Sequence, residues 1–502
     1  MNEFENPNGM VLDVDQNPKK IGQWLIFAVQ HILAMLVACI TVPLLTGLAI
    51  APTLIAAGVG TIAYILITKM KSPVFLSSSF AYISPMISAM GVGLMNQATG
   101  NNYLALILGM LMVGAVYGIV ALVVKFAGTG WLNKLLPSIV VGPVIMVIGL
   151  GLAGSAISNL TSASGITTAG ADKSYNLIAI LCGLIALFVT AFCSHYGKGK
   201  MISLIPFVVG MGSGYIAAVL FTVFGYYLGN VEYFHIFDFT PFVKIFGEGN
   251  FSFASFFNYK LFVPNDENAF LFLHIDEISK FDWASIGEVA LLFVPVAFVT
   301  ICEHIGDHEN LGNILQKDLL NGEPGMTRTL AGDGLATALS GALCGAANTT
   351  YGENVAVIGT TKIASVKVVL LAAILSVAIG FFTPFTALLS TIPSCVTGGV
   401  SLILYGFIAS SGVKMLIQQH IDLTNTKNIF IASVILVAGI GGLSLQFGPS
   451  GSPFITISAT AVSMILGIIM NYALKDKGEK SGAIGMTDAA SEDKTEEIPS
   501  GK

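Results

Sequence analysis

Apolar runs long enough to cross a lipid bilayer recur along this chain, and they leave few folds open to it. A helix needs about 20 apolar residues to span the hydrocarbon core. About fourteen such runs begin near Trp24, Leu48, Val74, Tyr103, Pro137, Asn176, Met201, Trp283, Thr327, Val355, Val366, Pro393, Thr426 and Pro453. Charged residues make up 10% of the 502 residues, against about a quarter in soluble domains. We therefore predict an all-α polytopic membrane protein with about 14 transmembrane segments.

Positive charges predict how these segments are oriented. Clusters of Lys and Arg fall on alternate connections, at Lys19-Lys20, Lys69-Lys71, Lys125 to Lys134, Lys198-Lys200, Lys317 to Arg328, Lys362 to Lys367, Lys414 to Lys427 and Lys475 to Lys480. Positively charged connections remain in the cytoplasm, so both termini are expected there. The first apolar run is too long for a signal-peptide core, and we expect it to remain as a helix in the cell membrane.

Two other regions differ from the apolar background. The connection from Gly229 to Asp282 is long and rich in aromatic residues. It is predicted to lie outside the cell, either as a partly ordered loop or docked through its aromatic residues on the membrane face or on a partner subunit. The segment 475–502 is charged and lacks apolar periodicity, which predicts a disordered tail.

Charge and cysteine usage narrow the range of functions. The net charge of -6 provides no basic surface, so no nucleic-acid partner is expected. The six cysteines are scattered through apolar runs without a CxxC spacing, which favours small packing residues over metal ligands or disulfides. We predict no cofactor.

One polar segment interrupts an apolar run in the second half of the chain. Asn348-Thr349-Thr350-Tyr351-Gly352-Glu353-Asn354 places an ionisable glutamate at membrane depth, where insertion costs about 2.5 to 3.5 kcal/mol unless the side chain faces a bundle interior or a wet cavity. A similar interruption, Leu76 to Ala81, lies in the first half. Each is the third crossing of its half. Corresponding broken segments predict a transporter built from an inverted repeat, with its binding site near mid-membrane.

A second polar cluster, Glu303 to Glu309, follows another apolar run. Glu303 and Asp307 are four residues apart and share one face of a helix. Carboxylates accept hydrogen bonds from the ring N–H groups of a pyrimidine or purine, so Glu303 and Glu353 are predicted to hold such a ring between them. The alternatives are an interfacial acid at the helix end for Glu303 and an outer cap for Asp307.

Other side chains are candidates for supporting this site. Phe80 offers an apolar face for stacking and a backbone N–H for a ring carbonyl, with ordinary packing as the alternative. Gln30 and His31, on the first helix, are expected to brace the site, although His31 could instead form a helix–helix hydrogen bond.

Competing functions start from the same region. His304 and His308, with Asp307, suggest an intramembrane metallohydrolase, but the HIGDH spacing lacks the acid that directly follows the first His in HExxH. A passive channel would need rings of acids or a glycine-rich filter. Anion transport is disfavoured because two acids would repel the substrate.

The polar motifs resemble those of the nucleobase/ascorbate transporter family, the nucleobase:cation symporters. The family signature has an acid or Gln, then Asn, a small residue two positions on, and later Thr with a basic residue. Matching positions are Thr350 to Ala356 with Thr361-Lys362, Gln30-His31, Ser78-Ser79-Phe80 and Glu303-His304-Ile305-Gly306. The resemblance extends from about Lys20 to Lys475.

The resemblance implies two inverted seven-segment repeats, with short β-strands in segments 3 and 10. A core domain holds the substrate against a gate domain that mediates dimerisation. The implied divisions are a cytoplasmic N-terminal segment (1–20), the first halves of the core (21–127) and gate (128–228), the extracellular loop (229–282), the second halves of the core (283–390) and gate (391–474), and the cytoplasmic tail (475–502).

The resemblance also assigns roles to residues. Glu303 and Glu353 would bind the base ring, and Gly352 and Phe80 would provide backbone contacts. Residues implied in proton coupling or in bracing the site are Glu303, Asp307, Glu353, His31, Gln30 and Asn354. Glu at position 353 is similar to the uracil permease branch, since purine carriers usually have Gln there.

Two positions depart from the family pattern. Ala356 stands where the family usually has Gly. Asp307 stands where one group of uracil permeases has His and purine carriers commonly have Asp. Substrate choice between uracil and xanthine therefore stays open at this point.

The resulting prediction is a secondary transporter, not an enzyme. It imports uracil with a proton by alternating access, as a homodimer in the cell membrane. Burial favours the neutral form of a carboxyl group, so Glu303 or Glu353 could take up the proton. Xanthine or another purine nucleobase is the alternative substrate, and sodium is the alternative coupling ion.

Overall fold

The computed structural model describes residues 9–90, 103–162, 175–197, 205–240, 242–243, 253–264, 269–270, 283–447 and 455–474. The predicted disordered tail at 475–502 lies outside the described residues, as do residues 1–8 and parts of the 229–282 connection.

Helices dominate the described chain, because a backbone in lipid must satisfy its polar groups within the segment. In the first half they are α1 (Ile21–Thr46), α2 (Ile50–Ile67), α3 (Ile83–Met90), α4 (Tyr103–Ala127), α5 (Gly130–Leu135), α6 (Ser138–Gly151), α7 (Ala153–Thr161), α8 (Leu177–Tyr196) and α9 (Pro206–Tyr227). In the second half they are α12 (Ile286–Leu315), α13 (Met326–Ala342), α14 (Gly352–Thr361), α15 (Val366–Phe381), α16 (Thr383–Ser390), α17 (Ser394–Gln418), α18 (Thr426–Ile440) and α19 (Ala459–Ala473).

The predicted membrane segments correspond to these helices. Every predicted apolar run overlaps a helix or a short strand followed by a helix. Within the described ranges, 8 helices are long and apolar enough to cross a membrane, and shorter apolar helices accompany them. The predicted all-α polytopic fold is therefore confirmed.

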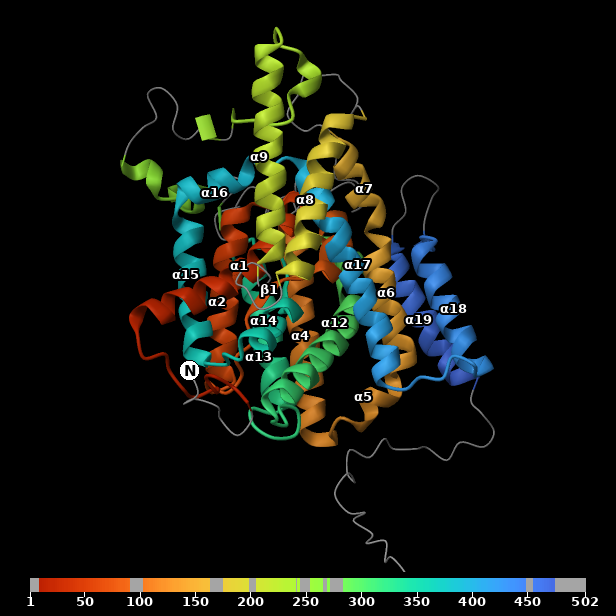
Figure 1. Ribbon diagram of the computed structural model, residues 1–502. Coiled ribbons are helices and arrows are strands. Elements are labelled where there is room, and N and C mark those ends of the chain that lie inside the picture. The colour runs from red at the N-terminus through yellow and green to blue at the C-terminus, as the bar shows by residue number, and fades with distance from the viewer. Residues whose placement is uncertain are drawn as a thin grey trace, which may run out of the picture.

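Two short strands pair inside the bundle, where Figure 1 labels β1. Strand β1 (Leu76–Ser78) pairs antiparallel with β2 (Asn348–Thr350), with Ser77 opposite Thr349. Extended backbone inside a membrane protein needs hydrogen-bond partners, and each strand provides them for the other. Each strand is followed by helical turns: the 3₁₀ helix η1 (Phe80–Tyr82) and α3 follow β1, and α14 follows β2. The predicted strands in segments 3 and 10 are confirmed.

A second small sheet was not predicted from the sequence. Strand β3 (Leu445–Phe447) pairs antiparallel with β4 (Ile455–Ile457), immediately before α19. Strands this short carry too little periodicity to be recognised in sequence.

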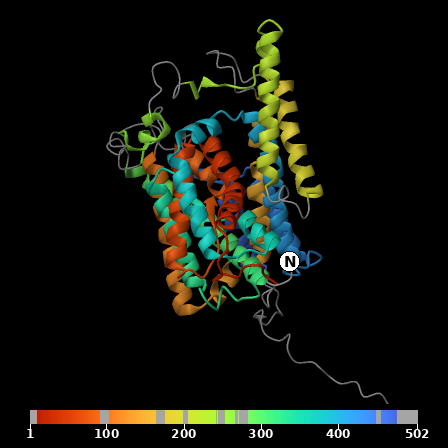
Figure 2. The same ribbon diagram turned by 60° about the vertical axis from the view of Figure 1, so that its left-hand side comes forward.

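The helices pack in two groups (Figures 1 and 2). In one group α2, α4, α13 and α15 contact one another, and α1 and α12 join them. In the other group α6, α7, α8 and α17 pack together, and α9, α18 and α19 complete it. Small residues let the helices of a group approach closely. A side chain at Gly399 on α17 would overlap the backbone of Gly183 on α8.

The described parts of the 229–282 connection are docked on the helices. The backbone N–H groups of Ile236 and Phe237 each donate to the Thr222 hydroxyl at 3.0 Å. Farther along, Leu261 and Phe270 are buried in a small apolar cluster with residues of α2. The described parts are therefore docked on helices of the same chain, an arrangement that differs from docking on the membrane face or on a partner subunit.

The N-terminal segment also packs against the bundle. The backbone N–H of Val11 donates to the Lys362 carbonyl at 2.8 Å, and Met10 is fully buried. The Asp13 carboxylate accepts a hydrogen bond from Lys317 at 2.9 Å. Residues 10–14 thus tie the end of α14 to the end of α12.

Gly60 on α2 is the position where β2 docks. A Cβ atom there would lie 2.5 Å from Nδ2 of Asn348, which donates to the Ala56 carbonyl at 3.0 Å. We expect Gly60→Ala to break this buried hydrogen bond at a cost of about 1 to 3 kcal/mol. The thermal midpoint of the purified protein should fall, although Ala is the better helix former by about 1 kcal/mol.

Gly118→Ala on α4 is the matched control, because nothing lies within 4 Å of a Cβ atom there. Its midpoint should stay the same or rise. Equal midpoints for the two variants would contradict this account of Gly60.

Candidate functional site

The site is formed by carboxyl groups from two helices. Glu303 and Asp307 lie on one face of α12, one turn apart, and Glu353 lies in the first turn of α14. The Glu303 carboxyl group interacts electrostatically with those of Asp307 and Glu353, and Glu353 interacts with Asp307. All three side chains are partly buried. The structure thus brings together the three acids that the sequence singled out.

Asp307 faces the start of α14. A Cβ atom on Gly352 would lie 3.3 Å from Oδ1 of Asp307. Helix α12 continues to Leu315, well beyond Asp307, so Asp307 does not cap the helix. The absence of a side chain at Gly352 leaves space between the two helices.

Phe80 comes from the first half of the chain and reaches the same region through the strand pair. The backbone N–H of Ser79 donates to the Ala347 carbonyl at 2.8 Å, which extends the pairing of β1 and β2 and fixes the start of η1. The Phe80 ring is buried and meets the ring of Tyr405 on α17 edge to face, with centroids 6.0 Å apart. Phe80 therefore lies at the boundary between the two helix groups.

A hydrogen bond between helices braces the start of α14. Nδ1 of His31 on α1 donates to Oδ1 of Asn354 at 2.9 Å, and both side chains are buried. This is the helix–helix hydrogen bond weighed for His31, and it ends at the residue after Glu353. Gln30 is also buried, but no hydrogen bond joins its side chain to another described residue.

Several buried polar atoms near the strand pair and α14 have no hydrogen-bond partner among the described residues. They include the hydroxyl groups of Ser79 and Tyr351 and Nδ2 of Asn354. Leaving such groups unpaired costs about 1 to 3 kcal/mol each. A ligand or water with both donors and acceptors would satisfy them.

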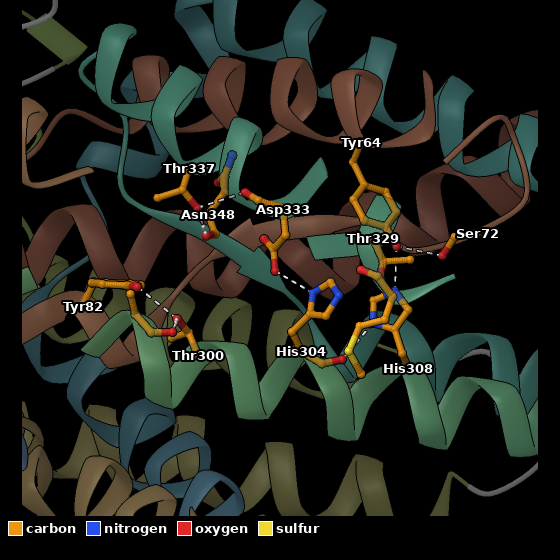
Figure 3. A network of polar contacts seen from close by, with 12 residues as sticks. Tyr64, Ser72, Tyr82, Thr300, His304, His308, Thr329, Asp333, Thr337 and Asn348 are labelled. Atoms are coloured by element: carbon orange, nitrogen blue, oxygen red, sulfur yellow. Dashed lines mark hydrogen bonds and ion pairs between the residues drawn. The ribbon is translucent and has the colours of Figure 1, made fainter. Parts of the chain in front are cut away.

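A neighbouring polar network was not predicted from the sequence (Figure 3). Nδ1 of His304 lies 2.7 Å from Oδ2 of Asp333 on α13. Nδ1 of His308 lies 2.8 Å from the His304 carbonyl, and its Nε2 lies 2.6 Å from the hydroxyl of Tyr64 on α2. The sequence signal for Asp333 was available: it is a lone acid in a mostly apolar run, as Glu353 is.

This network bears on the metallohydrolase alternative. Both ring nitrogens of His308 are engaged in hydrogen bonds, and Nδ1 of His304 is engaged with Asp333. No group of three His, Cys, Asp or Glu side chains within the described ranges has the geometry to hold a metal ion. The histidines therefore serve the protein network in this structure.

The fold and the site together define a multi-pass membrane transporter. Two halves meet through broken segments at mid-bundle, and acids gather beside them, as in transporters built from repeats.

Comparison with known proteins identifies the family. Residues 22–447 match the model of a permease family. The uracil permease of Bacillus caldolyticus is 40% identical over 467 residues, which are 93% of this chain and 95% of that relative. The uracil permease of Escherichia coli (strain K12) is 32% identical over 464 residues, 91% of this chain and 94% of that relative. The chain belongs to this permease family, so the resemblance drawn from its motifs and the prediction of a transporter, not an enzyme, are confirmed.

Solved structures support the fold. The transmembrane domain of the cyanobacterial bicarbonate transporter BicA has a TM-score of 0.54 at 11% identity and covers 91% of this chain and 98% of its own. The murine anion transporter Slc26a9, in its inward-facing state, has a TM-score of 0.59 at 10% identity and covers 91% of this chain and 69% of its own. At such low identity the likeness concerns the fold alone.

Proposed function

We propose that this protein imports uracil together with a proton. The observation that carries the proposal is the meeting of Glu303, Asp307 and Glu353 next to the paired strands. The 3₁₀ helix that begins with Phe80 also contacts α12. The uracil permeases that cover nearly all of the chain support the substrate. The same three acids argue against anion transport, because they would repel an anionic substrate.

Binding follows from the chemistry of the site. Uracil is planar and carries two ring N–H donors and two carbonyl acceptors. The carboxylates of Glu303 and Glu353 accept from the ring N–H groups, while the backbone N–H groups of Gly352 and Phe80 donate to the carbonyls. The Phe80 ring covers one edge of the site and excludes water.

Transport follows from movement between two domains. The proposed core comprises residues 21–127 and 283–390, and the proposed gate comprises residues 128–228 and 391–474. The contact between Phe80 and Tyr405 crosses this boundary, so relative movement of the domains would open and close the site. Both termini are placed in the cytoplasm by the positive-inside rule, and the gate domain is the proposed dimer contact in the cell membrane.

Proton coupling follows from repulsion among the acids. When two neighbouring carboxyl groups are ionised they repel each other, so a proton bound by one stabilises the cluster. Uracil then couples to the proton by binding one protonation state more tightly than the other. Asp307 contributes its charge to this cluster, and His31 and Asn354 fix the helix that carries Glu353.

Uptake of labelled uracil into proteoliposomes tests this function. We expect the initial rate to rise by about tenfold under an inward gradient of one pH unit, because proton binding is linked to transport. The rate should collapse when a protonophore is added. A sodium gradient of equal size is the control, and it should leave the rate unchanged. Uptake that did not respond to the proton gradient would contradict proton symport. A response to sodium would show that sodium is the coupling ion instead.

Xanthine or another purine nucleobase is the second candidate substrate, because Asp307 matches the residue that purine carriers commonly have at that place. Competition of unlabelled thymine, xanthine and hypoxanthine with labelled uracil separates the candidates. We expect uracil itself to compete best; stronger competition by xanthine would favour the second candidate.

A further inference from the structure

A buried chain of polar side chains lies along α12 (Figure 3). Its members are Asp333, His304, His308, Tyr64 and Ser72, and all five are fully buried. They come from α12, α13, α2 and the connection after α2. Burying this many polar groups in a membrane protein is costly and usually marks function.

The hydrogen bonds determine how His308 is protonated. Its Nδ1 faces the His304 carbonyl, which can only accept, so Nδ1 carries the hydrogen. In the neutral ring Nε2 is then an acceptor, and the Tyr64 hydroxyl donates to it at 2.6 Å. The Tyr64 oxygen accepts in turn from the Ser72 hydroxyl, 2.9 Å away. Nε2 of His308 is thus poised to take up a proton.

The inner end of the chain adjoins the proposed site. Asp333 contacts Nδ1 of His304 at 2.7 Å and interacts electrostatically with Glu303 and Asp307. The rings of His304 and His308 lie against each other with centroids 4.1 Å apart. Nε2 of His304 has no hydrogen-bond partner among the described residues, so it can accept a proton and pass it on.

The other end of the chain of side chains, at Ser72, approaches connections that are predicted to lie in the cytoplasm. With a rise of about 1.5 Å per residue, His308 lies roughly 7.5 Å nearer the C-terminal end of α12 than Glu303 does. Ser72 directly follows Lys71, which is exposed and paired with Glu323 of the connection between α12 and α13. The Lys71 ammonium lowers the pKa of Glu323, first through its hydrogen bond and then through its charge. Both connections belong to the positively charged set placed in the cytoplasm.

We propose that His304, His308, Tyr64 and Ser72 form the path by which the transported proton leaves the carboxyl cluster for the cytoplasm. The inference rests on the proposed symport. The Tyr64 hydroxyl first turns from Nε2 of His308 toward the Ser72 oxygen, which frees the lone pair of Nε2. A proton passed from Nε2 of His304 to Nε2 of His308 then makes the ring an imidazolium. The imidazolium passes this proton to the Tyr64 oxygen while Tyr64 passes its own proton to Ser72, and Ser72 passes one to water that reaches this buried hydroxyl when the protein opens to the cytoplasm. The hydroxyl groups are re-formed, and no net charge stays in the path.

The groups facing the two imidazole rings come from every helix packed around them. Tyr64 belongs to α2, Asp333 to α13 and Tyr117 to α4, the last meeting His304 edge to face with centroids 6.4 Å apart. Glu303 and Asp307 belong to α12 itself. The acids lie toward the site and the hydroxyl groups toward the cytoplasm. A proton that moves toward Ser72 leaves these negative charges behind, so their attraction opposes its release. The lower proton concentration of the cytoplasm under an inward gradient must drive this step.

Tyr64→Phe removes the link in the path without changing the shape of the side chain. Tyr82→Phe is the matched control, because Tyr82 is equally buried and its hydroxyl bonds Thr300 on the same α12 at 2.9 Å, outside the path. Ser72→Ala is a second variant that removes the outer end. It keeps the test decisive if Tyr64→Phe folds poorly.

Two transport modes separate proton release from substrate movement. Exchange of labelled for unlabelled uracil at equal pH moves the loaded protein in both directions and needs no proton release. Net uptake under an inward proton gradient needs release in every cycle. For Tyr64→Phe and Ser72→Ala we expect net uptake to fall by about tenfold or more while exchange stays within about twofold of wild type. Tyr82→Phe should retain the wild-type ratio of net uptake to exchange.

Three results would overturn the path. Parallel losses of exchange and net uptake in Tyr64→Phe and Ser72→Ala would mean that these hydrogen bonds only stabilise the fold. Unchanged net uptake in both variants would mean that the proton leaves elsewhere. Uptake by the wild-type protein that ignores the proton gradient would remove the proposed symport as well, and the wild-type arm of the same experiment shows which of the two has failed.

Discussion

Replacing Glu353 with Gln is expected to weaken uracil binding by about one to two orders of magnitude, the equivalent of a hydrogen bond to a charged group worth about 1.5 to 3 kcal/mol. Glu353 sits in the first turn of α14, where its carboxylate can accept from a ring N–H. The amide of Gln keeps the size but presents one acceptor and one donor. Its NH₂ group would face a ring N–H without forming a hydrogen bond. Binding can be measured calorimetrically on the purified protein, and xanthine should be included because purine carriers usually have Gln at this place.

Glu309→Gln is the matched control. It makes the same chemical change on α12, two residues beyond Asp307, at a partly buried position outside the proposed site. Its affinity for uracil should stay near that of the wild type. If Glu353→Gln bound uracil as tightly as the control, the clamp formed by Glu303 and Glu353 would be refuted.

Replacing Gly352 with Val is expected to abolish uracil binding and uptake. The Cβ atom alone would lie 3.3 Å from Oδ1 of Asp307, and the two methyl groups of Val would occupy the space between α12 and α14. They would also place apolar surface against an acid whose hydrogen-bonding capacity the site requires. The loss should exceed about 100-fold, because both the substrate position and the carboxylate are affected.

Gly359→Val on the same helix is the control for this change. There a Cβ atom would lie 3.1 Å from the end of the Ile314 side chain, which can move aside. The control should fold and bind uracil, so that a loss in Gly352→Val cannot be assigned to Val in α14 as such. Binding by Gly352→Val at wild-type affinity would place uracil away from the start of α14.

The acids of the site could be predicted because burial of an ionisable group leaves a signal in sequence. Glu353 stands in an apolar run, and the spacing of Glu303 and Asp307 places them on one helical face. The two interrupted segments could be predicted from sequence, and the family resemblance implied that they are strands. That β1 pairs with β2 was decided by the tertiary structure. The hydrogen bond from His31 to Asn354 was among the alternatives, since a polar side chain on an apolar helix requires a partner.

The network around His304 and His308 could be anticipated only in part. Their spacing placed both rings on one face, but it did not indicate their partners, and the metal site that it suggested lacked the acid that directly follows the first His in HExxH. The outcome depends on α13, where Gly332 lets the helix approach α2: a Cβ atom there would lie 2.8 Å from the Tyr64 ring. That approach brings Asp333 to His304 and Tyr64 to His308.

By itself the amino-acid sequence determined the membrane class, the succession of segments, the broken third crossing of each half and the acids that a membrane interior would not otherwise tolerate. These features follow from local composition and spacing, because each residue contributes its own free energy of transfer into lipid. Which buried groups become partners was decided only by the tertiary structure. Asp333 and Tyr64 meet the histidines of α12, and Ser72 meets Tyr64, through the packing of separate segments. The distances between helices depend on side-chain volume at contacts far apart in sequence.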